Sequence, residues 1–161
     1  DRALVLERFA DTPRASMNHR ANAALAQLAL AEAAAAQQPA LRDLYLTRAE
    51  AALAHLRGRQ GDAQMRLLAV QTAWARQGRT DPQALADYAV SYHAAPFMAG
   101  GALWRIAYGA LAWEHLAPAT RQAMLDEAVW LARRDGAMRP VVRDILGDTP
   151  AGMAFALRIT A

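Results

Sequence analysis

The sequence predicts an all-α fold of roughly eight helices. Alanine is abundant and β-branched residues are sparse, so helix is favoured over strand along almost the whole chain. Apolar residues recur three and four positions apart, which is the spacing of one helix face, while proline and glycine cluster between these periodic segments. A chain of 161 residues fits one domain, and we expect a single all-helical domain over residues 1–161.

The beginning of the chain predicts a short helix within residues 2–10, followed by a long alanine-rich helix. The segment Asp11-Thr12-Pro13 ends the short helix. The long helix begins near Ser16 and ends at Gln37-Gln38-Pro39, because proline cannot continue a helix. Pro39 then suits the first turn of the next helix, where a backbone N–H has no intrahelical partner in any case.

Two further helices are predicted over 40–57 and 63–77. The first carries a broad apolar stripe at helical spacing, made of Leu41, Leu44, Tyr45, Ala49, Ala52 and Leu56. Gly58 and Gly61 close this helix, and Asp62 is a suitable N-cap for the second.

In the second half of the chain, helices are predicted over 82–93, 101–116, 118–135 and 138–146, with one more from Pro150 onward. Most of them start with proline at the first helical position or end at glycine, as helices commonly do. The helix over 101–116 is apolar on nearly every face, which is typical of a buried central helix.

The helix over 118–135 also predicts an outward, charged face, formed by Arg121, Asp126, Glu127, Arg133 and Arg134. Two carboxyl groups that share acid and base chemistry need an apolar environment that shifts the pKa of one of them. We therefore interpret Asp126 and Glu127 as surface charges.

Four prolines divide the chain into repeating units. Pro39, Pro82, Pro118 and Pro150 each follow one helical segment and open another. Units that begin near 18, 62, 100 and 138 give a period of roughly 38 to 44 residues, which lies within the range of solenoid repeats. A helical hairpin cannot bury its own apolar faces, so we expect a short right-handed solenoid of about four antiparallel hairpins.

The alanine-rich helical pairs, with segments such as Leu44-Tyr45-x-x-x-Ala49-x-x-Ala52-Leu53, resemble the tetratricopeptide-like superfamily of helical repeats. The stretch from Ser91 to Leu116 is similar to the C-terminal part of short tetratricopeptide-like proteins of high-GC bacteria. Some of those proteins are associated with envelope polysaccharide assembly. The resemblance implies a scaffold role in that setting and favours a periplasmic or membrane-proximal location over a cytoplasmic one.

The charge of the chain argues against nucleic acid as a partner. All 18 basic residues are arginine, as expected from the codon bias of a GC-rich bacterial genome, and the net charge is a modest +3. The arginines are scattered instead of striped along one helix. No apolar run approaches 18 residues without a charge or a break, so we expect neither a membrane span nor a signal peptide.

The sequence predicts no catalytic residues, no cofactor and no metal. The absence of cysteine excludes disulfides, thiolate catalysis and cysteine zinc sites. Phosphate-binding, dinucleotide-binding and nucleophile-elbow motifs are absent too. The histidines are too widely separated to indicate a metal site; they are His19, His55, His93 and His115.

The stretch from Tyr88 to Trp113 holds most of the large aromatic residues and is the candidate contact surface. Tryptophan, tyrosine and arginine dominate binding hot spots, although aromatic residues at helical spacing, including Trp74 and Trp130, are also typical of a core. We predict a non-enzymatic module that binds a protein or peptide through Tyr88, Tyr92, His93, Phe97, Trp104, Arg105 and Tyr108.

Two alternatives stay open at this stage. One is a small helical bundle that binds a ligand or acts as an enzyme, with a pocket near His93 and Trp104. In that case His93 and an acid, Asp87 or Glu114, lie within hydrogen-bond reach. The other is a helical regulator domain that forms a homodimer through its C-terminal helices.

Overall fold

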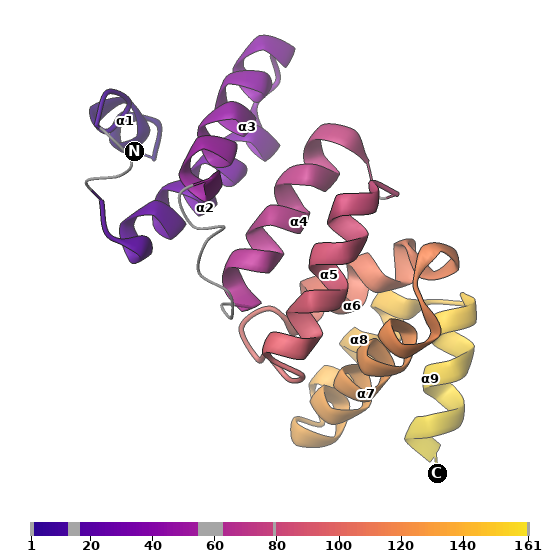
Figure 1. The fold of residues 1–161 in the computed structure, drawn as a ribbon. Helices are drawn as coiled ribbons and strands as arrows, with labels where there is room; N and C mark the ends of the chain where they lie inside the picture. The colour runs from indigo at the N-terminus through magenta and orange to yellow at the C-terminus, as the bar shows by residue number, and fades with distance from the viewer. Residues whose placement is uncertain (1, 13–16, 55–62, 79, 161) are drawn as a thin grey trace. The chain divides into compact units, whose positions relative to one another are not determined.

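Helices account for about four fifths of the residues that the structure describes, which are 2–12, 17–54, 63–78 and 80–160 of a computed structural model (Figure 1). These residues form nine α-helices and a short 3-10 helix and contain no strand, which confirms the prediction of an all-α fold. The chain divides into two compact units, Asp1–Gly78 and Arg79–Ala161, and each is described by itself. The single domain and the solenoid stay predictions.

Unit 1 consists of α1 (Arg2–Arg8), α2 (His19–Ala35), α3 (Pro39–Ala54) and α4 (Ala63–Gln77). The side chain of Asn18 caps α2 by accepting a hydrogen bond from the N–H of Ala21 at 2.8 Å. Alanines on the facing sides of α2 and α3 let the two helices pack closely. The core of unit 1 comprises Leu6, Leu25, Ala26, Ala29, Ala49, Ala52, Leu53 and Leu68.

The apolar stripe predicted on α3 is wrong at its N-terminal end. Leu41 and Leu44 are exposed, whereas Leu46 is almost completely buried together with Ala49 and Ala52. On the surface of α3, Ala49 and Ala52 lie close both to the line of Leu41 and Leu44 and to the line of Leu46. The apolar pattern alone therefore does not show which of these leucines faces the core. The predicted stripe residue Leu56 lies outside the described residues.

Charged side chains join α3 to α4 on the surface of unit 1. The guanidinium of Arg76 contacts Glu50 Oε1 at 3.0 Å and Asp43 Oδ1 at 3.2 Å. Arg42 donates a hydrogen bond to the carbonyl of Ala75 at 2.8 Å, within the last turn of α4. These contacts fix the C-terminal end of α4 against α3.

Unit 2 consists of α5 (Pro82–Ala94), α6 (Ala102–Leu111), the 3-10 helix Trp113–His115, α7 (Pro118–Arg134), α8 (Met138–Leu146) and α9 (Pro150–Thr160). The carboxylate of Asp81 accepts a hydrogen bond from the N–H of Ala84 at 2.7 Å and caps α5, with Pro82 at the first helical position. The helix predicted over 101–116 ends earlier, at Leu111, and the chain continues as the 3-10 helix.

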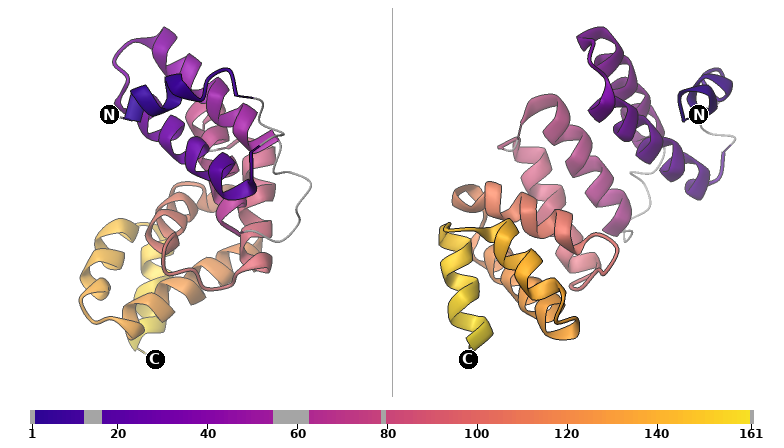
Figure 2. Two further views of the ribbon diagram at one scale, coloured as in Figure 1. Left: turned by 90° about the vertical axis from the view of Figure 1, so that its left-hand side faces the viewer. Right: turned by 180° about the vertical axis from the view of Figure 1, so that it is seen from behind.

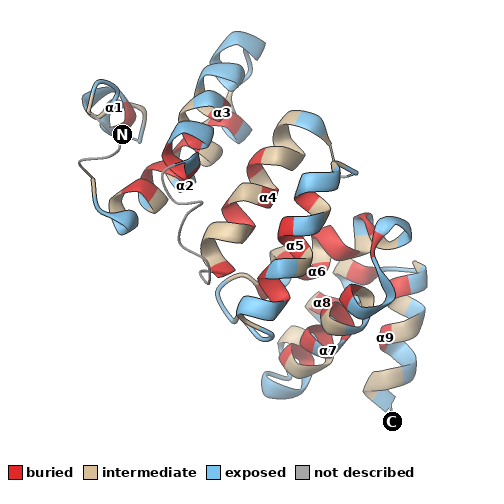
Figure 3. Cartoon of the chain, viewed as in Figure 1, coloured by how far each residue is buried: buried red, intermediate tan, exposed pale blue. Residues whose placement is uncertain are grey.

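The helix α7 lies at the centre of unit 2. It packs against α5, α6, α8 and α9, and α8 also packs against α6 and α9 (Figure 2). Buried residues gather along α6 and α7, where Ile106, Met124 and Ala128 are fully buried (Figure 3). Contacts between a helix and the next but one are typical of stacked hairpins.

No helix in the described part of the chain is both long enough and apolar enough to cross a membrane.

Candidate functional site

The core of unit 2 contains a buried ion pair between Arg105 on α6 and Glu127 on α7. Both side chains have an exposed fraction of 0%. Arg105 Nε donates a hydrogen bond to Glu127 Oε2 at 2.8 Å, and Arg105 Nη2 donates to Glu127 Oε1. The guanidinium and the carboxylate therefore meet side by side, in the two-bond geometry that makes arginine–carboxylate pairs strong.

The remaining N–H groups of Arg105 are directed at the C-terminal end of α5. Nη1 donates to the carbonyls of Ser91 at 3.2 Å and Ala95 at 2.9 Å, and Nη2 donates to the carbonyl of Pro96 at 3.2 Å. An arginine has five N–H donors, and each of them has an acceptor here. Arg105 therefore satisfies the carbonyls of Ala95 and Pro96 just after α5 and shares the Ser91 carbonyl with the N–H of Ala95. Its charge also suits the negative end of the helix dipole.

Two tyrosines complete the buried network. The ring centroid of Tyr92 lies 4.0 Å from the guanidinium carbon of Arg105, and its hydroxyl donates to Glu127 Oε2 at 3.1 Å. The hydroxyl of Tyr88 donates to the carbonyl of Arg105 at 2.9 Å. Burial raises the pKa of both tyrosines well above the ordinary value of 10.0, so both hydroxyls keep the protons that they donate.

The same ion pair holds the loop between α5 and α6 on both sides of Phe97. The carbonyl of Pro96 is bonded to Arg105, and the N–H of Met98 donates to Glu127 Oε1 at 2.9 Å. Phe97 itself is about half exposed, at 49%. Its ring lies against Trp130 of α7, with a centroid distance of 5.3 Å and an angle of 30° between the ring planes.

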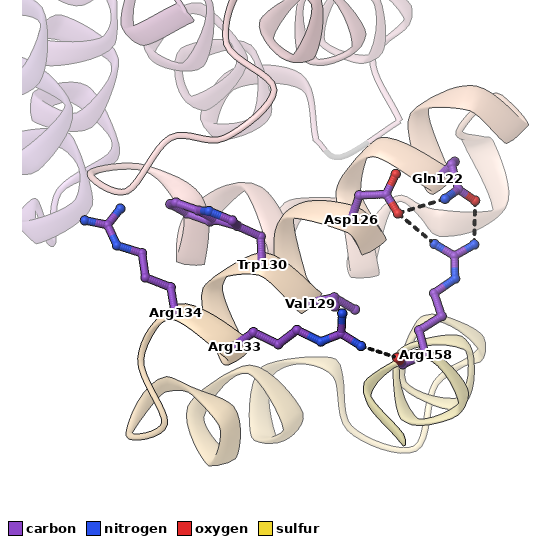
Figure 4. Close-up of a pocket in the computed structure, with 7 residues that line it drawn as sticks. All are labelled: Gln122, Asp126, Val129, Trp130, Arg133, Arg134 and Arg158. Carbon is purple, nitrogen blue, oxygen red and sulfur yellow. Dashed lines mark hydrogen bonds and ion pairs between the residues drawn. The ribbon is translucent and has the colours of Figure 1, made fainter. Parts of the chain in front are cut away.

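Trp130 lines an open groove of about 690 Å³ between α7 and α9 (Figure 4). The guanidinium carbon of Arg134 lies 5.1 Å from the centroid of the Trp130 ring, within the range of cation–π interactions. Arg158 of α9 pairs with Asp126 at 3.2 Å. The residues that line the groove are Gln122, Asp126, Val129, Trp130, Arg133, Arg134 and Arg158.

No protein-family model, no curated protein and no solved structure matches this chain. The tetratricopeptide-like relationship therefore stays a prediction.

The structure buries most of the residues predicted to line a contact surface, namely Tyr88, Tyr92, Arg105 and Tyr108. They form one cluster, in which the rings of Tyr88 and Tyr108 lie 4.9 Å apart. Trp104 is half-buried and stacks on Tyr108, with centroids 5.3 Å apart. A buried side chain offers no area to a partner in this conformation, so Tyr88, Tyr92, Arg105 and Tyr108 are part of the core of unit 2.

The other predicted contact residues, His93 and Phe97, are exposed. His93 lies in the last turn of α5, and Phe97 is the predicted residue whose ring packs against Trp130, which lines the groove. Partner binding by the predicted set, and a ligand pocket near His93 and Trp104, stay predictions.

The interpretation of Glu127 as a surface charge is wrong, because the structure buries it completely against Arg105. Glu127 lies three residues after Met124 and four before Leu131, both of which are buried, so it shares their helix face. Its neighbour Asp126 is exposed, as expected. The signal for this burial in the sequence is Arg105, the one basic residue in an apolar helix, because Glu127 carries the complementary charge.

Little in the sequence indicates the groove. In the sequence, Trp130 is one of several aromatic candidates, and helical periodicity predicts only an outward face for Arg133 and Arg134. Their meeting with Phe97 and Arg158 depends on the packing of α5 and α9 against α7.

Within the described ranges, no three histidine, aspartate or glutamate side chains come together as metal ligands would.

Proposed function

We propose that this chain is a non-enzymatic protein-interaction module that binds a partner segment in the groove around Trp130. The observation that carries the proposal is the packing of Phe97 and Arg134 against Trp130, which lines this groove. Tryptophan and arginine are enriched at the centres of protein interfaces, because they offer a large apolar area together with polar groups that fix orientation. All three side chains are at least partly exposed.

The buried ion pair supports this proposal through preorganisation. Phe97 lies in a loop, where ordering on binding would cost conformational entropy. Its two chain neighbours are already bonded to Arg105 and Glu127. A partner therefore meets an aromatic surface whose loop needs little further ordering.

The chemistry of the buried network also favours binding over catalysis. Both oxygens of Glu127 accept hydrogen bonds from donors held in place by the fold, and each N–H of Arg105 has a carbonyl or carboxylate acceptor. An acid–base residue needs a proton that it can exchange with a substrate. The most deeply buried charges of unit 2 are committed to the fold instead.

The resemblance noted in the sequence suggests the setting of this interaction. A scaffold role in envelope or polysaccharide assembly fits a module that presents one rigid groove to a partner segment. Under this proposal, Tyr88, Tyr92, Arg105 and Tyr108 maintain the groove, and Phe97 contacts the partner.

Affinity purification from the native host, with partners quantified by mass spectrometry, tests the proposal. Phe97→Ala and Trp130→Ala should each lose a partner that wild type recovers, while thermal unfolding of unit 2 changes little. Leu111→Ala is the matched control, because Leu111 is exposed at 47% on α6 and does not line the groove. Equal recovery by stably folded Trp130→Ala protein would contradict the proposal.

A further inference from the structure

From the charges of the same groove, we infer that its partner is an acidic peptide segment, with carboxylates on either side of an apolar residue. This inference rests on the proposed function and adds the chemical class of the partner. Two features of the groove support it: which charged side chains already have a partner of opposite charge, and where the remaining charged side chains lie.

Asp126, the one acidic residue that lines the groove, is already engaged. It pairs with Arg158 and accepts a hydrogen bond from Gln122 Nε2 at 2.8 Å. Arg158 also donates to Gln122 Oε1. Asp126, Gln122 and Arg158 therefore form a closed set at one wall, and the charge of Asp126 is balanced locally.

Arg133 and Arg134 are not balanced in this way. Among the described residues, neither forms an ion pair with a carboxylate, and both are exposed. Arg133 Nη2 donates to the carbonyl of Arg158 at 3.3 Å, and Arg134 lies over the ring of Trp130. The groove thus has two positive charges with donors left for a ligand, and guanidinium groups match carboxylates in shape and charge.

The directions of these two side chains indicate the spacing of the acidic residues. Arg134 extends to the Trp130 side of the groove, and Arg133 extends toward Arg158 (Figure 4). Val129 and Trp130 provide the apolar lining. A segment that contacts both arginines therefore needs acidic residues that are separated along its length, with an apolar side chain between them.

A nucleic acid fits the groove less well than a peptide. Nucleic-acid surfaces carry an extended excess of positive charge that follows the phosphates. Unit 2 contains as many acidic residues as arginines, so it carries no extended excess of positive charge. The indole of Trp130, which a base would need as a stacking platform, already contacts Phe97 and Arg134.

Selection from a displayed library of random dodecapeptides tests the inference. The full chain serves as the target, and the binding of the enriched peptides is then compared between wild type and Arg133→Gln/Arg134→Gln protein. Circular dichroism on heating should show that the double variant is as stably folded as wild type. We expect enriched peptides with separated acidic residues around an apolar one, and binding of a synthetic copy roughly 3- to 30-fold weaker to the double variant.

The other outcomes separate this inference from the proposed function. If the enriched peptides are neutral or basic but fail to bind Trp130→Ala protein, the acidic class would be overturned. The proposed interaction module would still stand. If a mixed-sequence single-stranded oligonucleotide binds through the two arginines and no acidic peptide does, the acidic-peptide class would be overturned in favour of nucleic acid. Peptides that bind all variants equally would contradict both proposals, and the arginines would then serve only the C-terminal end of α7.

Discussion

Arg105 and Glu127 form a fully buried ion pair in which each N–H of the arginine has an acceptor. The pair joins three parts of unit 2: the end of α5, the following loop and the centre of α7. Because the loop residues on both sides of Phe97 are bonded to it, the pair also places the Phe97 ring against Trp130. The candidate binding surface therefore depends on a buried polar network.

Removing either member of the ion pair should strongly destabilise unit 2. Arg105→Met or Glu127→Met leaves one charge buried without its partner, which typically costs about 3–5 kcal/mol. Arg105→Met/Glu127→Met removes both charges and should cost much less than the sum of the single changes. Urea unfolding of all four proteins measures this coupling. Additive costs would show that the two side chains do not act as a pair.

The surface ion pairs of Arg76 in unit 1 provide a contrast. Arg76 has a side-chain exposure of 26%, and its partners Glu50 and Asp43 are more exposed still. Exposed pairs contribute about 0.2–1 kcal/mol each, so Arg76→Met should cost on the order of 1 kcal/mol. Salt should weaken its contribution. A loss as large as that of Arg105→Met, measured in the same urea experiment, would contradict this account.

Gly109→Ala should destabilise unit 2, although alanine is usually better than glycine in a helix by about 1 kcal/mol. A Cβ at this position of α6 would clash with the hydroxyl of Tyr88 and lie 2.9 Å from Met124 Cγ. Crowding of this kind typically costs about 1–3 kcal/mol. The change should cost less in a Tyr88→Phe background, where the hydroxyl is absent. Equal costs in both backgrounds, measured by urea unfolding, would rule out the clash.

Alkaline pH should destabilise unit 2 through its buried tyrosines. Burial raises the pKa of Tyr108 to about 12 from an ordinary 10.0, and it raises the pKa of Tyr88 and Tyr92 as well. Below pH 10 all three are protonated in both states, so their contribution to stability is complete. Above pH 10 the unfolded chain releases these protons first, and stability falls by about 1.4 kcal/mol per pH unit for each tyrosine.

Absorbance of tyrosinate near 295 nm, followed together with circular dichroism, measures this effect. The ionisation of these tyrosines should coincide with the loss of helical signal. Ionisation of all the tyrosines near pH 10 in a fully helical protein would show that they are not buried as described.

The helices could be predicted from the sequence because local chemistry marks their ends. Asp81 followed by Pro82 predicts the start of α5, and the structure places Asp81 as its cap. Such signals act over a few residues and need no knowledge of the packing. The same holds for Pro118 and Pro150, which begin α7 and α9.

The buried network and the groove depend on contacts between residues that are distant in the sequence. Glu127 lies next to the exposed Asp126 but on the buried face of α7, and the position of Arg105 across the core explains how that face holds a carboxylate. The groove likewise requires Arg158 from α9 to meet α7, and Phe97 from a loop packs against Trp130 in its lining. Helical periodicity shows which face a residue occupies and does not show which helix covers that face.

Hydrogen exchange at the backbone amide of Met98 tests the central claim most directly. This amide lies in the loop between α5 and α6, and its hydrogen-bond acceptor is the carboxylate of Glu127 at 2.9 Å. If the buried pair holds the loop that carries Phe97, the Met98 amide should exchange at least about tenfold more slowly than the neighbouring amides of Phe97 and Ala99. Exchange of all three at the rate of an open loop would show that Glu127 does not fix this segment, and the account of the groove would fail.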